Sequence, residues 1–146
     1  MSKRIVLTLL AATALLAASA QIALSSNAVI RLELPSTKST YVDLNRKGYS
    51  AGDYFLSSGR LLNMSTHKPA GRMGGVWTIL SRAADNATFD LGLASGTIFV
   101  SGHIVHAAPK STLTISGGTG RYAGAQGTVT FRYLSQTSAE LDVRLQ

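Results

Sequence analysis

A glycine-rich segment between two alternating runs is the feature of this sequence that most restricts its fold. Residues 116–127 contain five glycines in twelve positions. The runs on either side, 111–115 and 128–134, alternate apolar and polar side chains as β-strands do. Glycine permits positive φ and close approach of another backbone. The segment therefore predicts a tightly specified corner between two strands.

A period of two recurs along the chain after residue 20, where no helical period is evident. The extended runs are 29–34, 41–44 (the weakest), 53–63, 71–82, 87–93, 96–105, 111–115, 128–134 and 137–145. Asp85 and Asn86 are interpreted as a turn before the run 87–93. About eight short strands separated by turn residues predict an all-β sandwich or barrel. We favour a closed antiparallel barrel, because closure removes edge strands.

Two of the runs are apolar on both faces, around Trp77 and around Phe99. In a small barrel one face of each strand would line the interior. The other face would then lie against a covering segment or a second subunit. The pattern predicts a homo-oligomer.

The first twenty residues have the layout of a secretory signal peptide. Lys3 and Arg4 precede an apolar run, residues 5–17, and small residues 18–20 follow as a cleavage site. The alternative is a membrane anchor, but the apolar run is short for a bilayer span. No later transmembrane candidate is seen in the sequence. We expect residues 21–146 to form one exported domain, either periplasmic or extracellular.

Composition excludes several classes of function. Without Lys3 and Arg4, 12 basic residues stand against 7 acidic ones, a net charge of +5. The basic residues are scattered, whereas nucleic-acid proteins concentrate them in a patch, so no nucleic-acid partner is expected. Cysteine is absent, which excludes disulfides and thiolate chemistry.

Two further motifs suggest a nucleotide site and a zinc site, but their context supports neither. Residues 118–123 fit a dinucleotide fingerprint, but an alternating strand follows where that fingerprint requires a helix. His103 and His106, considered with His67 as zinc ligands, are three apart on a strand and would point to opposite faces. No nucleophile elbow is present. We expect neither a metal nor a cofactor.

Three blocks of sequence resemble the allene oxide cyclase and dirigent proteins. They are residues 71–77 (Gly-Arg-Met-Gly-Gly-Val-Trp), residues 95–102, which end at a glycine, and the corner at 117–127. The resemblance spans roughly residues 51–134. It implies an eight-stranded β-barrel with a hydrophobic lumen, assembled as trimers.

The resemblance carries over residue by residue only in part. A glutamate on the first strand of the cyclases would correspond to Glu33. The cyclase tyrosine and cysteine positions read Ser95 and Trp77 here. The dirigent aspartate positions read Ser57 or Ser58, and Ile104. The resemblance therefore covers the scaffold rather than the catalytic set.

The candidate site is a lumenal pocket with apolar walls and a few polar groups. Trp77 would stack on a ligand ring, Arg60 and Arg72 would stabilise negative charge on an oxygen, and Glu33 would stabilise a cation or take a proton. The predicted catalytic residues are Glu33 and Arg60, and the predicted substrate-binding residues are Tyr54, Arg72, Trp77, Ser95 and Tyr122. The alternatives are ordinary: Trp77 as core, and Tyr122 as a cap on the barrel end.

The sequence thus predicts an exported barrel that encloses a small hydrophobic molecule and steers its cyclisation or stereoselective coupling, as an isomerase-like enzyme. The chemistry would come mainly from holding the substrate in one folded conformation. A non-catalytic, secreted ligand-binding or interaction barrel is the alternative. A structural oligomer with a filled lumen is a third possibility.

Overall fold

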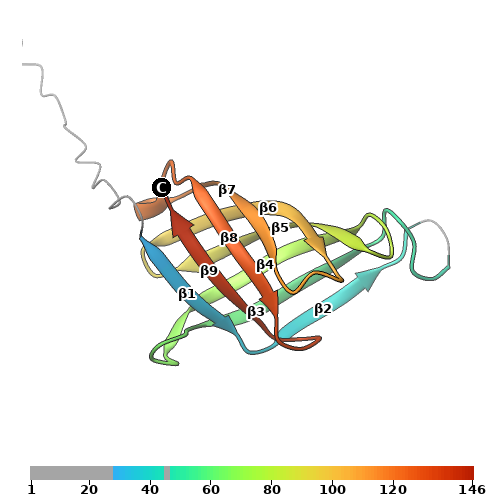
Figure 1. Cartoon of the computed structure of the whole chain (residues 1–146), viewed down its shortest axis with the longest axis horizontal. Coiled ribbons are helices and arrows are strands. Elements are labelled where there is room, and N and C mark those ends of the chain that lie inside the picture. Colours follow the sequence, from blue (N-terminus) through green and yellow to red (C-terminus); the bar gives the residue numbers. More distant parts are fainter. Residues whose placement is uncertain (1–27, 45–46) are drawn as a thin grey trace, which may run out of the picture.

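The computed structural model describes residues 28–44 and 47–146, so the predicted signal peptide lies outside the described residues. Within them, all the strands join one antiparallel sheet (Figure 1). The strands are β1 (Val29–Leu34), β2 (Thr37–Val42), β3 (Tyr54–Asn63), β4 (Pro69–Ile79), β5 (Ala84–Leu93), β6 (Gly96–Val105), β7 (Ser111–Gly118), β8 (Gly127–Tyr133) and β9 (Ala139–Leu145). One 3-10 turn, η1 (Gly120–Tyr122), lies in the glycine-rich corner.

Pairing between β1 and β3 closes the sheet into a barrel. The strand order is β1-β9-β8-β7-β6-β5-β4-β3-β2, and Leu32 and Glu33 of β1 also pair with Asn63 and Leu62 of β3. Eight strands therefore form a closed antiparallel barrel, as the sequence predicted. The ninth strand, β2, continues along β3 beyond the end of β1 and pairs with no other strand in the described residues.

The alternation of side chains separates a packed interior from an outer face. In the part of the chain that the structure describes, one apolar cluster draws on every barrel strand and on η1. Its larger members are Leu32, Leu34, Leu61, Met73, Trp77, Phe89, Leu91, Ile98, Val100, Ile104, Leu113, Ile115, Tyr122, Val129, Phe131, Leu141, Val143 and Leu145. Phe99 of β6 lies on the outer face and is exposed, with 41% of its surface accessible.

The interior depends on a glycine beneath the aromatic side chains. Gly75 of β4 pairs with Phe89 of β5, and a Cβ atom built on Gly75 would lie 2.3 Å from the Phe89 Cβ. The same atom would lie 2.6 Å from the Thr88 carbonyl oxygen, which belongs to the backbone and has little freedom to move. Gly75 therefore allows β4 and β5 to approach closely where the barrel is filled.

Gly75→Ala is expected to destabilise the barrel by about 1–3 kcal/mol, because the added methyl group overpacks the interior. Gly92→Ala is the matched control in the neighbouring strand, since its Cβ would lie 3.6 Å from the Arg72 carbonyl oxygen, an ordinary contact. Urea denaturation of both variants measures the difference. Equal stability of the two variants would contradict the packing described here.

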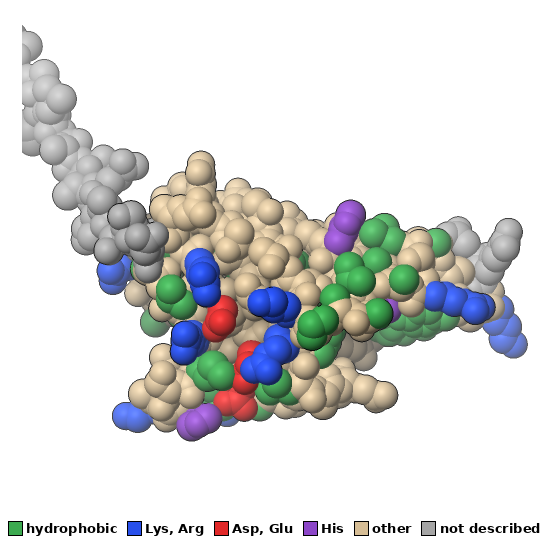
Figure 2. Space-filling view, viewed as in Figure 1, with side chains coloured by type: hydrophobic (Ala, Val, Ile, Leu, Met, Phe, Trp, Pro, Cys, Tyr) green, Lys and Arg blue, Asp and Glu red, His purple; other side chains and the backbone are tan. Residues whose placement is uncertain are grey.

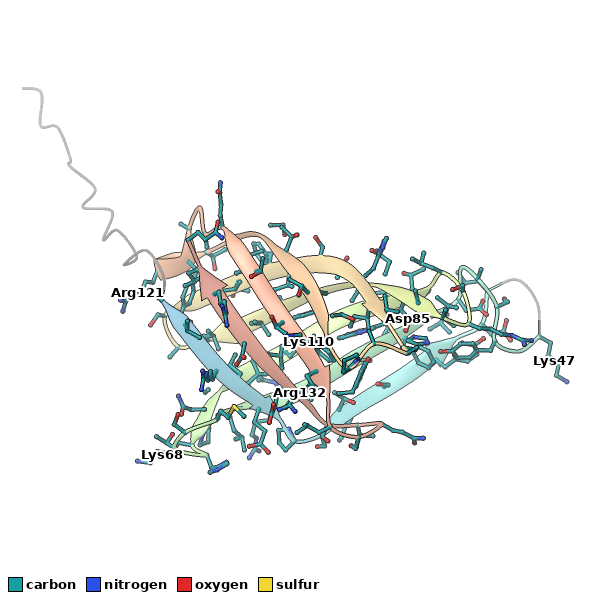
Figure 3. The ribbon with its side chains drawn as sticks, in the orientation of Figure 1. Lys47, Lys68, Asp85, Lys110, Arg121 and Arg132 are labelled. Atoms are coloured by element: carbon teal, nitrogen blue, oxygen red, sulfur yellow. The ribbon has the colours of Figure 1, made fainter. Side chains whose placement is uncertain are left out.

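The two ends of the barrel differ. The turns after β4, β6 and β8 lie at one end, together with β2 and the segment that leads into β3. The β5–β6 turn, η1 and the end of β9 lie at the other end. Figure 3 shows this arrangement: Asp85 lies toward the end that carries Lys47, and Arg121 lies at the opposite end. Among the described residues, no helix has the length and apolar character to span a membrane.

Candidate functional site

A cavity of about 990 Å³ opens at the end of the barrel where β2 lies. This volume is at the upper limit of the ~300–1,000 Å³ typical of small-molecule sites. Its lining residues are Leu34, Thr37, Ser39, Tyr49, Phe55, Ser57, Trp77, Asp85, His106, Phe131, Tyr133, Ser135, Gln136 and Thr137. The mouth lies between β2 and the β8–β9 turn, where the Thr37 hydroxyl donates to the Thr137 carbonyl at 3.4 Å.

Aromatic side chains form much of the cavity wall. The Trp77 ring stacks on Phe89 with centroids 5.6 Å apart and planes 2° apart. Phe131 meets Phe89 edge-on at 6.2 Å, and Tyr133 meets Phe131 edge-on at 4.9 Å. These contacts hold the rings in fixed orientations, so the wall is a preformed surface for a flat apolar molecule.

A second aromatic group lies on the β2–β3 side of the cavity. Tyr49 and Phe55 have ring centroids 5.7 Å apart. Tyr41 of β2 stacks on Tyr49 at 5.8 Å. Tyr49 itself is exposed, so this side of the cavity also faces solvent.

Asp85 and His106 form an ion pair in the cavity wall. Asp85 alternates with the buried Ala87 and Phe89 along β5, which places its side chain on the interior face. His106 directly follows β6, and its Nε2 lies 3.0 Å from Asp85 Oδ2. The Nδ1 of the same ring lies 3.2 Å from the Arg82 carbonyl oxygen.

Both ring nitrogens of His106 therefore face hydrogen-bond acceptors. A carboxylate and a carbonyl oxygen cannot donate, so both contacts are satisfied only when both nitrogens carry protons. The hydrogen bond to Asp85 accordingly raises the pKa of His106, with burial opposing the shift and the Asp85 charge and the Arg82 carbonyl adding to it. This arrangement favours the imidazolium form of His106 beside the Asp85 carboxylate.

Two polar atoms of the cavity-lining residues have no hydrogen-bond partner. Asp85 Oδ1 and Trp77 Nε1 are both buried and unpaired. Leaving such groups unpaired costs about 1–3 kcal/mol each. Each such atom in a native structure requires an explanation, and a bound ligand, ion or water is one that an adjacent cavity allows.

Tyrosine hydroxyls near the pair remain protonated at neutral pH. Burial, followed by the charge of Asp85, raises the pKa of Tyr133 to about 12. The neighbouring Trp77 side chain acts against this shift. Burial and the Asp85 charge also raise the pKa of Tyr49. Both phenols are therefore hydrogen-bond donors at the cavity.

Asp53 anchors the segment that carries Tyr49. Its carboxylate accepts hydrogen bonds from the Leu44 N–H at 2.9 Å, the Tyr41 hydroxyl at 2.7 Å, and the Ser50 N–H and hydroxyl, both at 2.8 Å. The Leu44 N–H and the Tyr41 hydroxyl are the main groups that lower the pKa of Asp53 to about 2. Because these donors favour the charged form, ionised Asp53 stabilises this wall of the cavity.

Asp53→Asn is expected to lower the melting temperature at neutral pH, since an amide cannot replace all of these acceptor contacts. The folded pKa of Asp53 is about 2, below its ordinary value of 3.8. Its contribution is therefore complete above about pH 4 and is lost as the pH falls toward 2. Thermal unfolding between these pH values should show a weaker pH dependence for Asp53→Asn than for the wild type. An identical dependence would contradict this role.

Among the predicted site residues, Trp77 lines the cavity and the others lie elsewhere. Glu33 lies between the buried Leu32 and Leu34, so it faces outward, where its Oε2 lies 3.1 Å from His67 Nδ1. Arg60 and Arg72 are cross-strand partners and both are exposed.

Tyr54, Ser95 and Tyr122 also lie away from the cavity. Tyr54 precedes Phe55 on β3 and therefore faces outward. Ser95 lies in the β5–β6 turn, where its carbonyl accepts from the Arg121 N–H at 2.8 Å. Tyr122 is buried, and its place in η1 puts it at the opposite end of the barrel. The structure thus does not bring these residues together with Trp77.

The outer face over β1, β9 and β8 carries pairs of oppositely charged side chains. Figure 2 shows basic and acidic side chains side by side there. Arg31 Nε lies 3.8 Å from Asp142 Oδ1, and Arg132 pairs with Glu140. Exposed pairs of this kind contribute little to stability, typically about 0–1 kcal/mol.

Sequence reasoning missed the polar pair of the cavity. The sequence suggests a turn at Asp85, and it raises His106 only as a zinc ligand. The one available signal was alternation: Asp85 lies two positions before Ala87 and four before Phe89, on the same face of an extended strand. No local signal connects His106 to Asp85, 21 residues away.

Comparison with known proteins identifies the barrel. The family model described as "Allene oxide cyclase barrel like domain" matches residues 35–145. No curated protein matches the chain.

Several solved structures share the fold. A pyocyanin demethylase is similar at 22% identity and a TM-score of 0.71, over 82% of this chain and 100% of that chain. An exo-specific intermolecular Diels-Alderase is similar at 19% identity and a TM-score of 0.64, over 82% and 96% of the two chains. A pterocarpan synthase dirigent protein is similar at 14% identity and a TM-score of 0.63, over 82% and 91%.

Proposed function

Since the chain belongs to the allene oxide cyclase barrel-like family, we propose that it binds a small, flat hydrophobic molecule in the open end of its barrel and steers the cyclisation or stereoselective coupling of that molecule. The observation that carries the proposal is the cavity of about 990 Å³, with its aromatic walls and its single carboxylate–imidazolium pair. The sequence-based interpretation named the same lumen but, apart from Trp77, different residues.

The aromatic walls would supply most of the effect on rate and product. A cavity that holds a flexible substrate in one folded conformation lowers the entropic part of the barrier and excludes other products. The ring contacts among Trp77, Phe89 and Phe131 fix one wall, and Tyr49 and Phe55 form the other. A cyclisation of this kind rearranges bonds within the substrate, so no atom enters or leaves.

The polar groups would respond to charge that develops during ring closure. The Tyr133 hydroxyl, which stays protonated, would donate to an oxygen that gains electron density. The Asp85 carboxylate would stabilise positive charge elsewhere on the same substrate. The names of two similar structures, a Diels-Alderase and a dirigent protein, support a role of this type on the same fold.

A carrier without catalysis is the second candidate, and one observation favours it. Both nitrogens of His106 are directed at Asp85 and at the Arg82 carbonyl, so the imidazolium has no proton free for a substrate. Turnover would then have to come from shape and from the groups named above. A carrier would bind the same molecules and leave their product ratio unchanged.

Export and self-association complete the proposal. The signal-like residues 1–20 support an extracytoplasmic protein. Exposed apolar side chains on the outer face, Leu56 of β3 and Phe99 of β6, support a homo-oligomer such as a trimer.

The test uses substrates that react spontaneously: a tethered diene and dienophile, an allylic epoxide, and a phenoxyl radical generated in situ. Chiral chromatography measures the product ratio with and without protein. We expect the wild type to shift the enantiomeric ratio of at least one product, and Tyr133→Ala at the mouth to reduce that shift. Thr112→Ala, on the outer face of β7, is the control and should behave as the wild type. Tight binding with unchanged ratios would favour the carrier.

A further inference from the structure

We infer that the cavity selects flat aromatic cations, with Asp85 Oδ1 as the counter-ion and the aromatic walls as the contact faces. This inference rests on the proposed function, because it names the class of molecule that the same cavity would take. It goes beyond that function in assigning a charge to the ligand.

The unpaired oxygen specifies the polarity of the ligand. Asp85 is only 6% exposed, and its Oδ2 is already held by His106. Oδ1 is buried and has no partner. An ionised carboxylate oxygen can only accept a hydrogen bond or attract a positive charge. A group that satisfies Oδ1 must therefore be a donor or a cation.

The aromatic faces favour a cation over a neutral donor. Aromatic side chains contribute a large part of the lining: Tyr49, Phe55, Trp77, Phe131 and Tyr133. The faces of such rings carry negative potential, and tryptophan attracts cations most strongly. A flat cationic ring would gain stacking area together with this attraction. A neutral flat ring would gain the stacking area alone.

The distribution of charge supports the same ligand. The described residues that line the cavity include no lysine or arginine, although the whole chain has a formal net charge of +7. The imidazolium of His106 contacts Oδ2 and turns its other N–H toward the Arg82 carbonyl. A cation in contact with Oδ1 lies closer to the carboxylate than to the imidazolium. Coulomb energies fall with distance, so its attraction to the carboxylate exceeds its repulsion by the imidazolium. The net effect at Oδ1 is attractive.

A pair of closely related probes, which differ by one N-methyl group and the charge that it fixes, tests the inference directly. N-methylacridinium is a fixed cation, and acridine is its neutral counterpart at about pH 7.5. Trp77 is the single tryptophan of the chain, so quenching of its fluorescence reports on the cavity wall. We expect the wild type to bind the cation at least about tenfold more tightly than acridine, a difference of about 1.4 kcal/mol.

Asp85→Asn is expected to reduce this preference to within about twofold, mainly by weakening the binding of the cation. Asp90→Asn is the matched control, since Asp90 lies on the same strand and is exposed on the outer face. It should retain the wild-type preference. If Asp85→Asn does not fold, the ratio of the two probes on the wild type decides the question alone.

Equal affinity of the wild type for both probes would overturn the inference and leave the proposed function standing, since a flat molecule would still occupy the cavity. Tighter binding of acridine than of the cation would overturn it in the same way. If neither probe quenches Trp77, the inference fails, and the product-ratio assay decides the proposed function separately.

Discussion

Trp77→Ala is expected to lower the free energy of unfolding by about 3–5 kcal/mol, as for other large-to-small substitutions in packed interiors. The Trp77 ring is 6% exposed and stacks face to face on Phe89, so its removal leaves a void beside that ring. Because Trp77 also lines the cavity, binding of flat ligands should be lost as well. Urea denaturation followed by circular dichroism measures the first effect, and calorimetry measures the second.

Trp77→Phe separates these two effects. A phenyl ring can still pack on Phe89, so this variant should recover most of the stability. It lacks the indole N–H, which has no partner within the protein, so a ligand that accepts from this group should bind more weakly. If Trp77→Ala were as stable as the wild type, the packing of the interior described above would be contradicted.

His106→Gln is expected to destabilise the protein by about 1–3 kcal/mol below pH 6.5. The substitution removes the partner of a carboxylate whose side chain is only 8% exposed. His103→Gln is the matched control, because His103 lies on β6 three residues earlier and is exposed. Chemical denaturation of the two variants at several pH values makes the comparison.

The pH dependence gives His106→Gln a second readout. The pKa of His106 is raised in the folded protein above its ordinary value of 6.5. Its contribution is therefore complete below pH 6.5 and is lost as the pH rises through the raised pKa. The wild type and His103→Gln should share this loss, whereas His106→Gln should lack it. The same slope in all three proteins would show that the ion pair does not stabilise the fold.

The barrel itself could be predicted because its signals are local. The runs 29–34 and 96–105 coincide with β1 and β6, since alternation with a period of two directly reports which side chains face the interior. The start of β2 was less visible. Pro35 and Ser36 suggest an end to the strand, but the chain resumes pairing with β3 at Thr37, because β3 extends beyond the end of β1.

The site was predicted less well because its residues meet through pairing of distant segments. Glu33 was chosen from the family resemblance, although its alternation with Leu32 and Leu34 places it outside the barrel. Asp85 and Asn86 suggested a turn, but the turn is made earlier, where the N–H groups of Leu80 and Ser81 both donate to the Ala84 carbonyl at 3.1 Å. β5 therefore begins at Ala84 rather than at Ala87, and Asp85 lies within the strand on its interior face.

The most direct test of the central claim is a proton–nitrogen correlation spectrum of the labelled protein, in which Trp77 contributes the single indole N–H signal. Adding N-methylacridinium or acridine should shift this signal together with the backbone signals of Asp85, His106 and Tyr133. The account predicts that the signals of Glu33, Arg60 and Arg72 stay in place. Shifts confined to those outer residues, with the indole signal unmoved, would contradict a ligand site inside the barrel.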